Sequence, residues 1–208
     1  MLTVLFLGAR ASGKTHLLQQ CYRNLTQHHN TDRDDVAEYS SEMSNVLPSV
    51  LEMSPKKNNT EFLVQTLARR TVPAVVVAMS KSTSEFSTTK DIVRFARNNC
   101  PKAQIALVVT KSDKSYNRSE QDFDSMVLDT MQAAEGVQRL FYTSALHGKG
   151  GSDLRSWVDD AVLSHISGED YAYFGSANTP LKRQKYKVRK LATPRGCTTD
   201  GCESCTLQ

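Results

Sequence analysis

Residues 2–15, LTVLFLGARASGKT, contain the feature of the sequence that decides the fold. An apolar run ends at Gly8, the residues from Gly8 to Thr15 satisfy G-x-x-x-x-G-K-[ST], and helical periodicity follows. Strand, loop and helix in this order are the context in which this pattern binds phosphate. In such a loop Gly13 would let backbone N–H groups approach phosphate oxygens at a helix N-terminus, Lys14 would reach the β and γ phosphates, and the Thr15 hydroxyl would hold Mg²⁺. The stretch predicts a phosphate-binding loop. The alternative is a glycine-rich turn that binds nothing.

Strand-like and helix-like stretches alternate along the chain. Apolar runs typical of strands occupy residues 2–7, 46–53, 74–79, 105–110 and 140–144. Helical periodicity occupies residues 14–23, 60–70, 88–98 and 125–134, and a last helix has an apolar face formed by Leu154, Trp157, Val158, Ala161 and Val162. This alternation predicts an α/β fold with a doubly wound, mostly parallel sheet and helices on both faces. Residues 28–45 are polar, and we expect a long loop there with a short edge strand at 36–40.

Composition predicts one folded domain at 1–167 and a basic linker and tail at 168–208. The 208 residues are 39% hydrophobic and 23% charged, which suits a sizeable core and excludes collagen, coiled coil and complete disorder. No apolar run reaches the roughly 18 residues of a membrane span, and the N-terminal run is too short for a signal peptide, so we expect a cytoplasmic protein. Residues 171–208 carry 7 of the 26 Lys and Arg but 2 of the 22 Asp and Glu. A nearly neutral folded part followed by a basic tail predicts that the tail binds an anionic surface. It also predicts that the protein has no nucleic-acid partner.

A second motif stands at the end of another strand-like run. Thr110-Lys111-Ser112-Asp113 follows residues 104–109, and ligands of parallel sheets bind beyond the carboxyl ends of the strands. Here the chain resembles the Ras superfamily of small GTPases, whose guanine motif is [NT]-K-x-D. The resemblance implies that Asp113 accepts hydrogen bonds from guanine N1–H and the N2 amino group, while the Lys111 stem packs on the base. Adenine offers no matching pair of donors, so the site would select GTP and GDP. The alternative is an ordinary polar turn.

A third motif, Ser144-Ala145-Leu146, follows the next strand-like run and is similar to the final S-A-x motif of the superfamily. The resemblance implies that backbone N–H groups of these residues contact the guanine O6. It covers nearly the whole folded part, and the stretches 98–113 and 142–162 look most like the Rho branch. It implies a P-loop small G-domain that binds GTP or GDP with Mg²⁺. The nucleotide-binding residues implied are Gly8, Ala11, Ser12, Gly13, Lys14, Thr15, Thr110, Lys111, Asp113, Ser144, Ala145 and Leu146.

The chain departs from the superfamily at two places that serve hydrolysis. Small GTPases carry D-x-x-G after the third strand, with the Asp on a Mg²⁺-bound water, but residues 53–58 read MSPKKN and no Gly occurs between Gly13 and Gly136. Arg10 stands where Ras and Rho proteins have Gly, because a side chain there crowds the γ-phosphate and an incoming arginine finger. We therefore expect slow hydrolysis. Two alternatives stay open: a misaligned switch region, or catalysis by Arg10 or by one of the lysines within 53–58, with Arg10 as the candidate catalytic residue.

The resemblance also implies a loop threonine that completes Mg²⁺ coordination together with Thr15. Thr31, in the stretch HHNTDRDD at 28–35, is the candidate, and Thr26 is the second choice. We interpret the neighbouring His and Asp residues as a solvated loop and not as a metal site, since no strand or helix fixes their geometry.

The tail ends in CTLQ at 205–208, which fits the C-a-a-X prenylation pattern of the farnesyl class. A single prenyl chain anchors weakly, so the preceding basic residues and a palmitoyl chain on Cys202 or Cys197 would supply a second signal. We predict lipidation of Cys205 and a location on the cytoplasmic face of the plasma membrane or endomembranes. The alternatives are a nuclear-localisation or RNA-binding stretch, and a metal or redox site formed by the three tail cysteines.

Together these patterns predict an atypical, monomeric, membrane-anchored small GTP-binding protein that acts as a signalling or trafficking switch and hydrolyses GTP slowly to GDP and phosphate. Its effectors and exchange factors are not specified by the sequence. A second hypothesis is a pseudo-GTPase scaffold with little or no nucleotide turnover. A third is a P-loop kinase or ATPase, which would leave TKSD and SAL without a role.

Overall fold

The computed structural model describes residues 1–22, 25–28, 36–41, 49–56, 59–81, 86–115, 119–133 and 136–167. The tail at 168–208 with Cys197, Cys202 and Cys205 lies outside these residues, as does the switch candidate Thr31. The strands are β1 (Leu2–Gly8), β2 (Leu25–His28), β3 (Val36–Ser41), β4 (Ser49–Met53), β5 (Thr71–Ser80), β6 (Gln104–Thr110) and β7 (Val137–Tyr142). The helices are α1 (Lys14–Cys21), α2 (Thr60–Ala68), α3 (Phe86–Asn99), α4 (Glu120–Ala133) and α5 (Gly151–Ser167).

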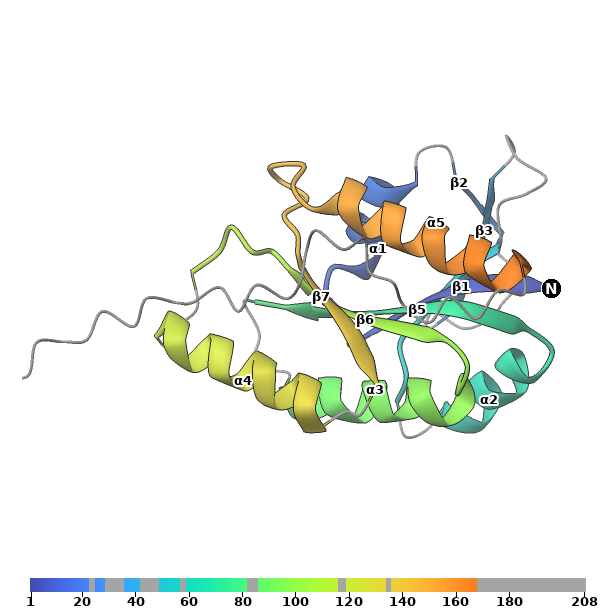
Figure 1. The fold of residues 1–208 in the computed structure, drawn as a ribbon, viewed down its shortest axis with the longest axis horizontal. Coiled ribbons are helices and arrows are strands. Elements are labelled where there is room, and N and C mark those ends of the chain that lie inside the picture. The colour runs from blue at the N-terminus through green and yellow to red at the C-terminus, as the bar shows by residue number, and fades with distance from the viewer. Residues whose placement is uncertain are drawn as a thin grey trace, which may run out of the picture. The chain divides into compact units, whose positions relative to one another are not determined.

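The strands form one seven-stranded sheet in the order β2-β3-β4-β1-β5-β6-β7. Strands β4, β1, β5, β6 and β7 pair in parallel, whereas β2 with β3 and β3 with β4 pair antiparallel. Helices α1 and α5 cover one face of the sheet and α2, α3 and α4 cover the other (Figure 1). The predicted doubly wound, mostly parallel α/β fold is therefore confirmed.

Two apolar cores lie on the two faces of the sheet. Val75 and Val77 of β5 pack in the core shared with α2, α3 and α4, whereas Ala74 and Val76 of the same strand pack in the core shared with α1 and α5. Because helices cover both faces, a central strand needs apolar side chains at every position, and β5 is apolar or buried from Pro73 to Ser80. Burial of each Val side chain contributes about 1.5–3 kcal/mol to stability.

Helix α1 and strand β7 differ from their predicted bounds. Helix α1 ends at Cys21 and not at residue 23, because Tyr22 takes an extended conformation (φ −128°, ψ 113°) and its ring packs edge-on against Phe6. Strand β7 begins earlier, at Val137, and ends at Tyr142. The chain turns away after it, and Ser144 pairs with Lys149 across a tight turn. The predicted strand at 140–144 was therefore wrong at both ends.

The edge of the sheet carries a strand that the sequence analysis did not predict. Strand β2 pairs antiparallel with β3, from Leu25 opposite Ser41 to His28 opposite Glu38. Its residues 26–28 are exposed, so the apolar alternation that normally indicates a strand is missing. The short strand expected at 36–40 is present as β3, but it is not the edge strand, because β2 pairs with its outer side. Thr26, the second candidate for the switch threonine, lies in β2 and is exposed.

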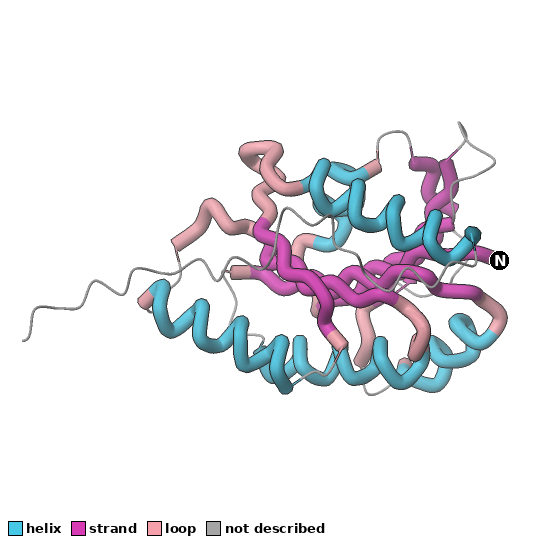
Figure 2. Tube along the Cα trace, in the orientation of Figure 1, coloured by secondary structure: helices cyan, strands magenta, loops and turns pink. Residues whose placement is uncertain are grey.

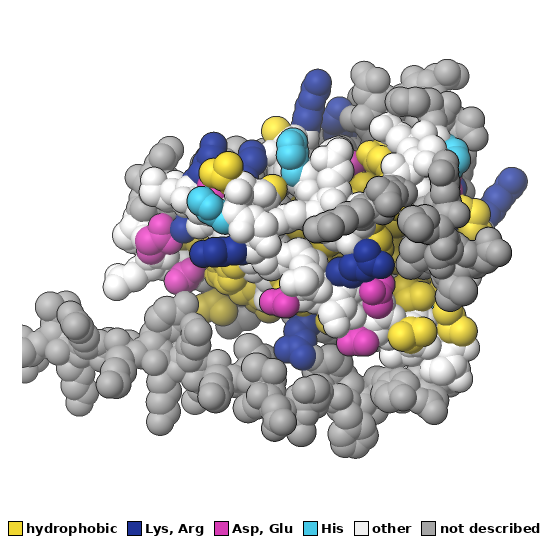
Figure 3. Space-filling model, turned by 90° about the horizontal axis from the view of Figure 1, so that it is seen from above, with side chains coloured by type: hydrophobic (Ala, Val, Ile, Leu, Met, Phe, Trp, Pro, Cys, Tyr) yellow, Lys and Arg dark blue, Asp and Glu magenta, His cyan; other side chains and the backbone are white. Residues whose placement is uncertain are grey.

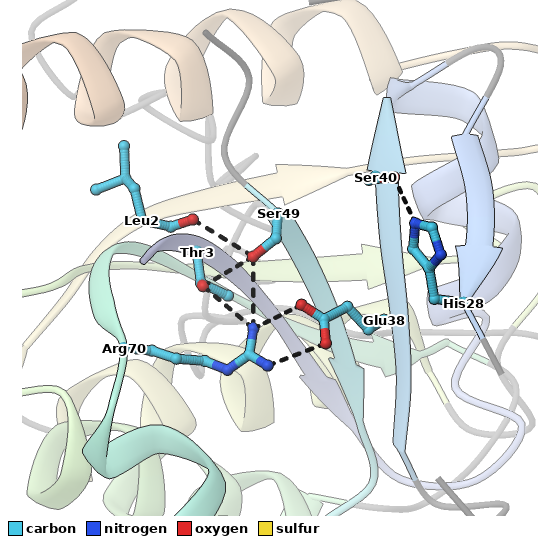
Figure 4. Close-up of polar contacts among 7 residues, drawn as sticks. All are labelled: Leu2, Thr3, His28, Glu38, Ser40, Ser49 and Arg70. Carbon is cyan, nitrogen blue, oxygen red and sulfur yellow. Dashed lines mark hydrogen bonds and ion pairs between the residues drawn. The ribbon is translucent and has the colours of Figure 1, made fainter. Parts of the chain in front are cut away.

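A cluster of polar side chains joins strands β1, β3 and β4 to the chain that follows α2 (Figure 4). The Arg70 guanidinium donates to both carboxylate oxygens of Glu38, at 2.8 and 3.0 Å. The hydroxyl oxygens of Thr3 and Ser49 lie 2.9 Å apart, and both lie within 3.5 Å of the same guanidinium. Arg70 lowers the pKa of Glu38 through this bond. The cluster fastens the end of the sheet opposite the phosphate loop.

Replacing this carboxylate should weaken the fold in a pH-dependent way. We expect Glu38→Gln to lower the free energy of unfolding by about 1–2 kcal/mol at pH 7, because it removes a two-pronged charged hydrogen bond. Since the folded-state pKa of Glu38 lies below its ordinary value of 4.5, the stabilisation is complete above that pH and is lost as the pH falls through the lowered pKa. Urea unfolding should therefore separate wild type and variant at pH 7 and bring them together as the pH falls below the lowered pKa of Glu38.

The matched control is Asp91→Asn, because Asp91 forms an exposed ion pair with Arg94 on α3. Exposed pairs contribute little to stability, so this variant should unfold like the wild type. A Glu38→Gln protein that matches the wild type at pH 7 would contradict the structural role of the cluster.

The described surface carries charges of both signs. On the face in Figure 3, Lys and Arg side chains are interspersed with Asp and Glu, so this face shows no large area of one sign among the described residues. Within the described ranges, no helix has the length and apolar character that crossing a membrane requires.

Candidate nucleotide-binding site

The three sequence motifs meet at one edge of the sheet. The phosphate loop follows β1, TKSD follows β6 and SAL follows β7, and these strands run in parallel. Their carboxyl ends therefore lie together, and the loops after β6 and β7 project at the same end of the molecule (Figure 2). This is the edge at which open α/β sheets bind ligands.

The backbone of the phosphate loop needs both of its glycines. Gly13 has φ of 88°, and Ala11 has φ of 63°. A Cβ at Gly13 would lie 3.0 Å from the Thr110 hydroxyl oxygen, and a Cβ at Gly8 would lie 2.5 Å from the Ala78 carbonyl oxygen. Side chains at these two positions would thus displace the loop from β5 and β6.

The polar groups of the loop suit an anion. Helix α1 begins at Lys14, so its first backbone N–H groups face the loop, where the helix dipole favours negative charge. Lys14 is buried, and its ammonium donates to the Ala9 carbonyl at 2.8 Å. The Ser12 hydroxyl is buried and has no hydrogen-bond partner among the described residues. A buried polar atom of this kind fits a site that is completed by a phosphate oxygen.

Residues of the TKSD motif hold the phosphate loop. The Thr110 hydroxyl donates to the Ser12 carbonyl, and the Lys111 ammonium donates to the Ala11 carbonyl at 3.0 Å. Lys111 has φ of 55°, a left-handed conformation that turns the chain out of β6. Two segments about one hundred residues apart are therefore joined into one site.

Asp113 and Ser144 form the polar end of the site. The Ser144 hydroxyl donates to an Asp113 carboxylate oxygen, and the His147 backbone N–H donates to the Ser144 oxygen at 3.3 Å. The bond from Ser144 lowers the pKa of Asp113, whose carboxylate is exposed. An ionised carboxylate only accepts hydrogen bonds. Held in one orientation, its two oxygens can accept from two neighbouring N–H groups of a ligand.

A cavity of about 220 Å³ lies between these groups. It is lined by Gly13, His16, Leu17, Gln20, Thr110, Lys111, Asp113, Lys114, Thr143, Ala145 and Leu146. Most of the predicted nucleotide-binding residues thus surround one cavity or form the loop beside it. Leu146 is 79% exposed and lies at its rim.

Sequence reasoning missed the side of this cavity that α1 provides. The Gln20 amide donates to the Ser144 carbonyl at 3.1 Å, which joins α1 to the SAL turn. The other amide atom of Gln20 is buried and has no hydrogen-bond partner among the described residues. His16 and Gln20 are spaced one helical turn apart on α1, and that spacing was the available signal.

The two departures that bear on hydrolysis lie in the phosphate loop and in the chain after β4. Arg10 is exposed on the phosphate loop, and it forms no hydrogen bond or ion pair with another described residue. After Met53, the chain makes a turn in which the Asn59 side chain accepts from the Lys56 N–H and donates to the Ser54 carbonyl, at 2.8 and 3.2 Å. Lys57 and Asn58, which complete the stretch compared with D-x-x-G, lie outside the described residues.

A carboxylate nevertheless lies beside the phosphate loop. The Thr15 hydroxyl donates to Glu52 at 2.7 Å, and the Tyr39 hydroxyl donates to the other oxygen of Glu52 at 3.0 Å. Burial and the Glu52 charge raise the pKa of Tyr39 above its ordinary value, so Tyr39 remains a donor. The sequence comparison with D-x-x-G began at Met53, so it did not consider Glu52, which lies one position earlier.

Comparison with known proteins supports the fold that these features indicate. The chain has the α/β fold of a small G-domain. It is similar to the Arl6 BBS3 small GTPase from Trypanosoma brucei, solved with the bound nucleotide analogue GppNp, with a TM-score of 0.59 and 18% sequence identity. The match covers 78% of this chain and 97% of that structure. No family profile and no curated protein sequence matches the chain.

Proposed function

We propose that this protein binds guanine nucleotides and acts as an atypical small GTP-binding switch with slow hydrolysis. The observation that carries the proposal is the Asp113 carboxylate, which accepts a hydrogen bond from Ser144 and lines the same cavity as Gly13 of the phosphate loop. A purine base that donates two hydrogen bonds to Asp113 would place its phosphates toward the loop and Lys14. The similarity to a small GTPase solved with a bound GTP analogue supports the binding of a guanine nucleotide.

Mg²⁺ is part of the same proposal. Thr15 offers a hydroxyl at the start of α1, directly after the phosphate loop. Oxygen donors of this kind, together with phosphate oxygens, are what Mg²⁺ prefers. The ion would neutralise phosphate charge when it is bound, and the protein residues would hold the nucleotide and orient Thr15.

Two other functions would have different signatures. A pseudo-GTPase scaffold would keep the fold without nucleotide turnover, and a kinase or ATPase would bind adenine. Chromatography of the nucleotide released by denaturing freshly purified protein distinguishes these hypotheses. We expect GDP or GTP, whereas adenine nucleotide would favour the kinase or ATPase and no nucleotide would favour the scaffold.

We also propose that the tail anchors the protein to an anionic membrane through lipidation of Cys205. This proposal rests on the terminal CTLQ and on the basic residues before it. The prenyl chain supplies the insertion energy, and each basic residue near the surface adds about 1 kcal/mol.

Membrane attachment should therefore respond differently to two changes. Cys205→Ser should move nearly all of the protein from the membrane fraction to the soluble fraction. Charge reversal of the basic residues within 182–190 should only weaken attachment, and more so at high salt, because charges are screened and the apolar chain is not. Cell fractionation measures both, and an unmodified Cys205 in protein purified from its own cells would exclude this mechanism.

A further inference from the structure

Glu52 is placed to act on the phosphate loop although it lies before the stretch compared with D-x-x-G. It pairs with Phe6 of β1 in the parallel register, two residues before the loop begins at Gly8. Leu51 and Met53 of β4 belong to the core under α2, α3 and α4, so alternation puts Glu52 on the face of α1. That is the face from which the first turn of α1 reaches the sheet.

Both oxygens of the Glu52 carboxylate are held by hydroxyl groups. Thr15 donates to one oxygen at 2.7 Å and Tyr39 donates to the other at 3.0 Å. A hydroxyl has one proton and two lone pairs, so the Thr15 oxygen can give its proton to Glu52 and still offer lone pairs to a cation. The bond therefore orients the one protein hydroxyl that the loop motif assigns to Mg²⁺.

Among the described residues, no basic side chain forms an ion pair with Glu52. The ion pairs found among the described residues join other carboxylates, and Glu52 is half-buried. A partly desolvated carboxylate with only neutral donors attracts a cation, and a cation at this position would also face the phosphates of a nucleotide.

We infer that Glu52 is the carboxylate of the Mg²⁺ site, replacing the aspartate that residues 53–58 lack. The longer side chain of Glu starts one strand position before Met53 and brings its carboxylate to Thr15. Tyr39 is a positioning residue, because it acts through Glu52. The inference rests on the proposed function, since it concerns the metal that accompanies the nucleotide.

The test is the release of fluorescent GDP from the full-length protein over a series of buffered free Mg²⁺ concentrations. In the wild type we expect Mg²⁺ to slow release. Glu52→Gln should raise the Mg²⁺ concentration for half-maximal slowing about 10- to 100-fold and leave the release rate in EDTA nearly unchanged. Tyr39→Phe should change that concentration in the same direction by a smaller factor. Glu38→Gln, a carboxylate on the neighbouring strand that binds Arg70, is the control and should respond like the wild type.

The possible outcomes separate this inference from the proposed function. If the wild type does not retain fluorescent GDP, the proposed function is wrong. If it retains GDP but Mg²⁺ does not slow release, or if Glu52→Gln responds like the wild type, Glu52 is not part of a Mg²⁺ site. Should circular dichroism show that Glu52→Gln is unfolded, Tyr39→Phe decides the question, and an unchanged Mg²⁺ response in that variant overturns the inference.

Discussion

Asp113→Asn is expected to change the base preference of the protein from guanine to xanthine. Asp113 offers two acceptor oxygens in an orientation set by Ser144. Asparagine puts an amide donor in place of one acceptor, which opposes the N2 amino group of guanine and matches the C2 carbonyl of xanthine. We expect GTP affinity to fall about 10²- to 10³-fold, because a polar group in the site is left without its partner, and xanthosine triphosphate affinity to rise.

Competition titrations against a fluorescent nucleotide would measure both affinities. Asp129→Asn provides the matched control, because Asp129 is exposed on α4 and does not line the cavity. This variant should bind GTP like the wild type. If Asp113→Asn kept the full affinity for GTP, Asp113 would not be part of the base-binding site.

GTP hydrolysis is expected to be slow, at or below the roughly 10⁻⁴ s⁻¹ of unassisted small GTPases. Catalysis of phosphoryl transfer depends on positioning and on charge stabilisation. The turn after β4 contains Ser54, Pro55 and Lys56, and none of them is a carboxylate, glycine or glutamine that would place the attacking water. Arg10→Gly should change the single-turnover rate less than about twofold, because Arg10 is exposed and forms no polar contact with another described residue.

Single-turnover hydrolysis of preloaded GTP tests this expectation. The fraction of each protein that holds GTP at the start must be equal, so that only turnover is compared. A rate about 10²-fold or more above the unassisted value, lost in Arg10→Gly, would show that Arg10 stabilises the transition state in cis.

The parts of the site that could be predicted from the sequence are those formed by short contiguous motifs. The phosphate loop and TKSD each combine a strand, a turn and restricted side chains within a few positions, so their fold context and their place at one sheet edge followed directly. The parts that could not be predicted depend on pairing across the sheet. Glu52 reaches Thr15 only because β4 lies beside β1 in a particular register, and a single sequence does not specify that register.

The same reasoning explains the errors in the fold. Strand β2 is short and mostly exposed, so it has no apolar pattern, and its existence follows from its pairing with β3. The predicted end of β7 was too late because Thr143 and Ser144 continue a run that looks like a strand. In the structure the Thr143 N–H donates to the Val109 carbonyl, and the chain then turns. Gln20 was missed because its spacing from His16 puts both residues on one face of α1 but does not indicate which turn that face contacts.

The central claim is that the cavity beside the phosphate loop selects guanine nucleotides. Equilibrium competition of GTP and ATP for the purified wild-type protein, with fluorescent GDP as the probe and Mg²⁺ held constant, tests it most directly. The account predicts that GTP displaces the probe at a concentration about 10⁴-fold lower than ATP does. Equal displacement by GTP and ATP, or displacement by neither, would contradict the account.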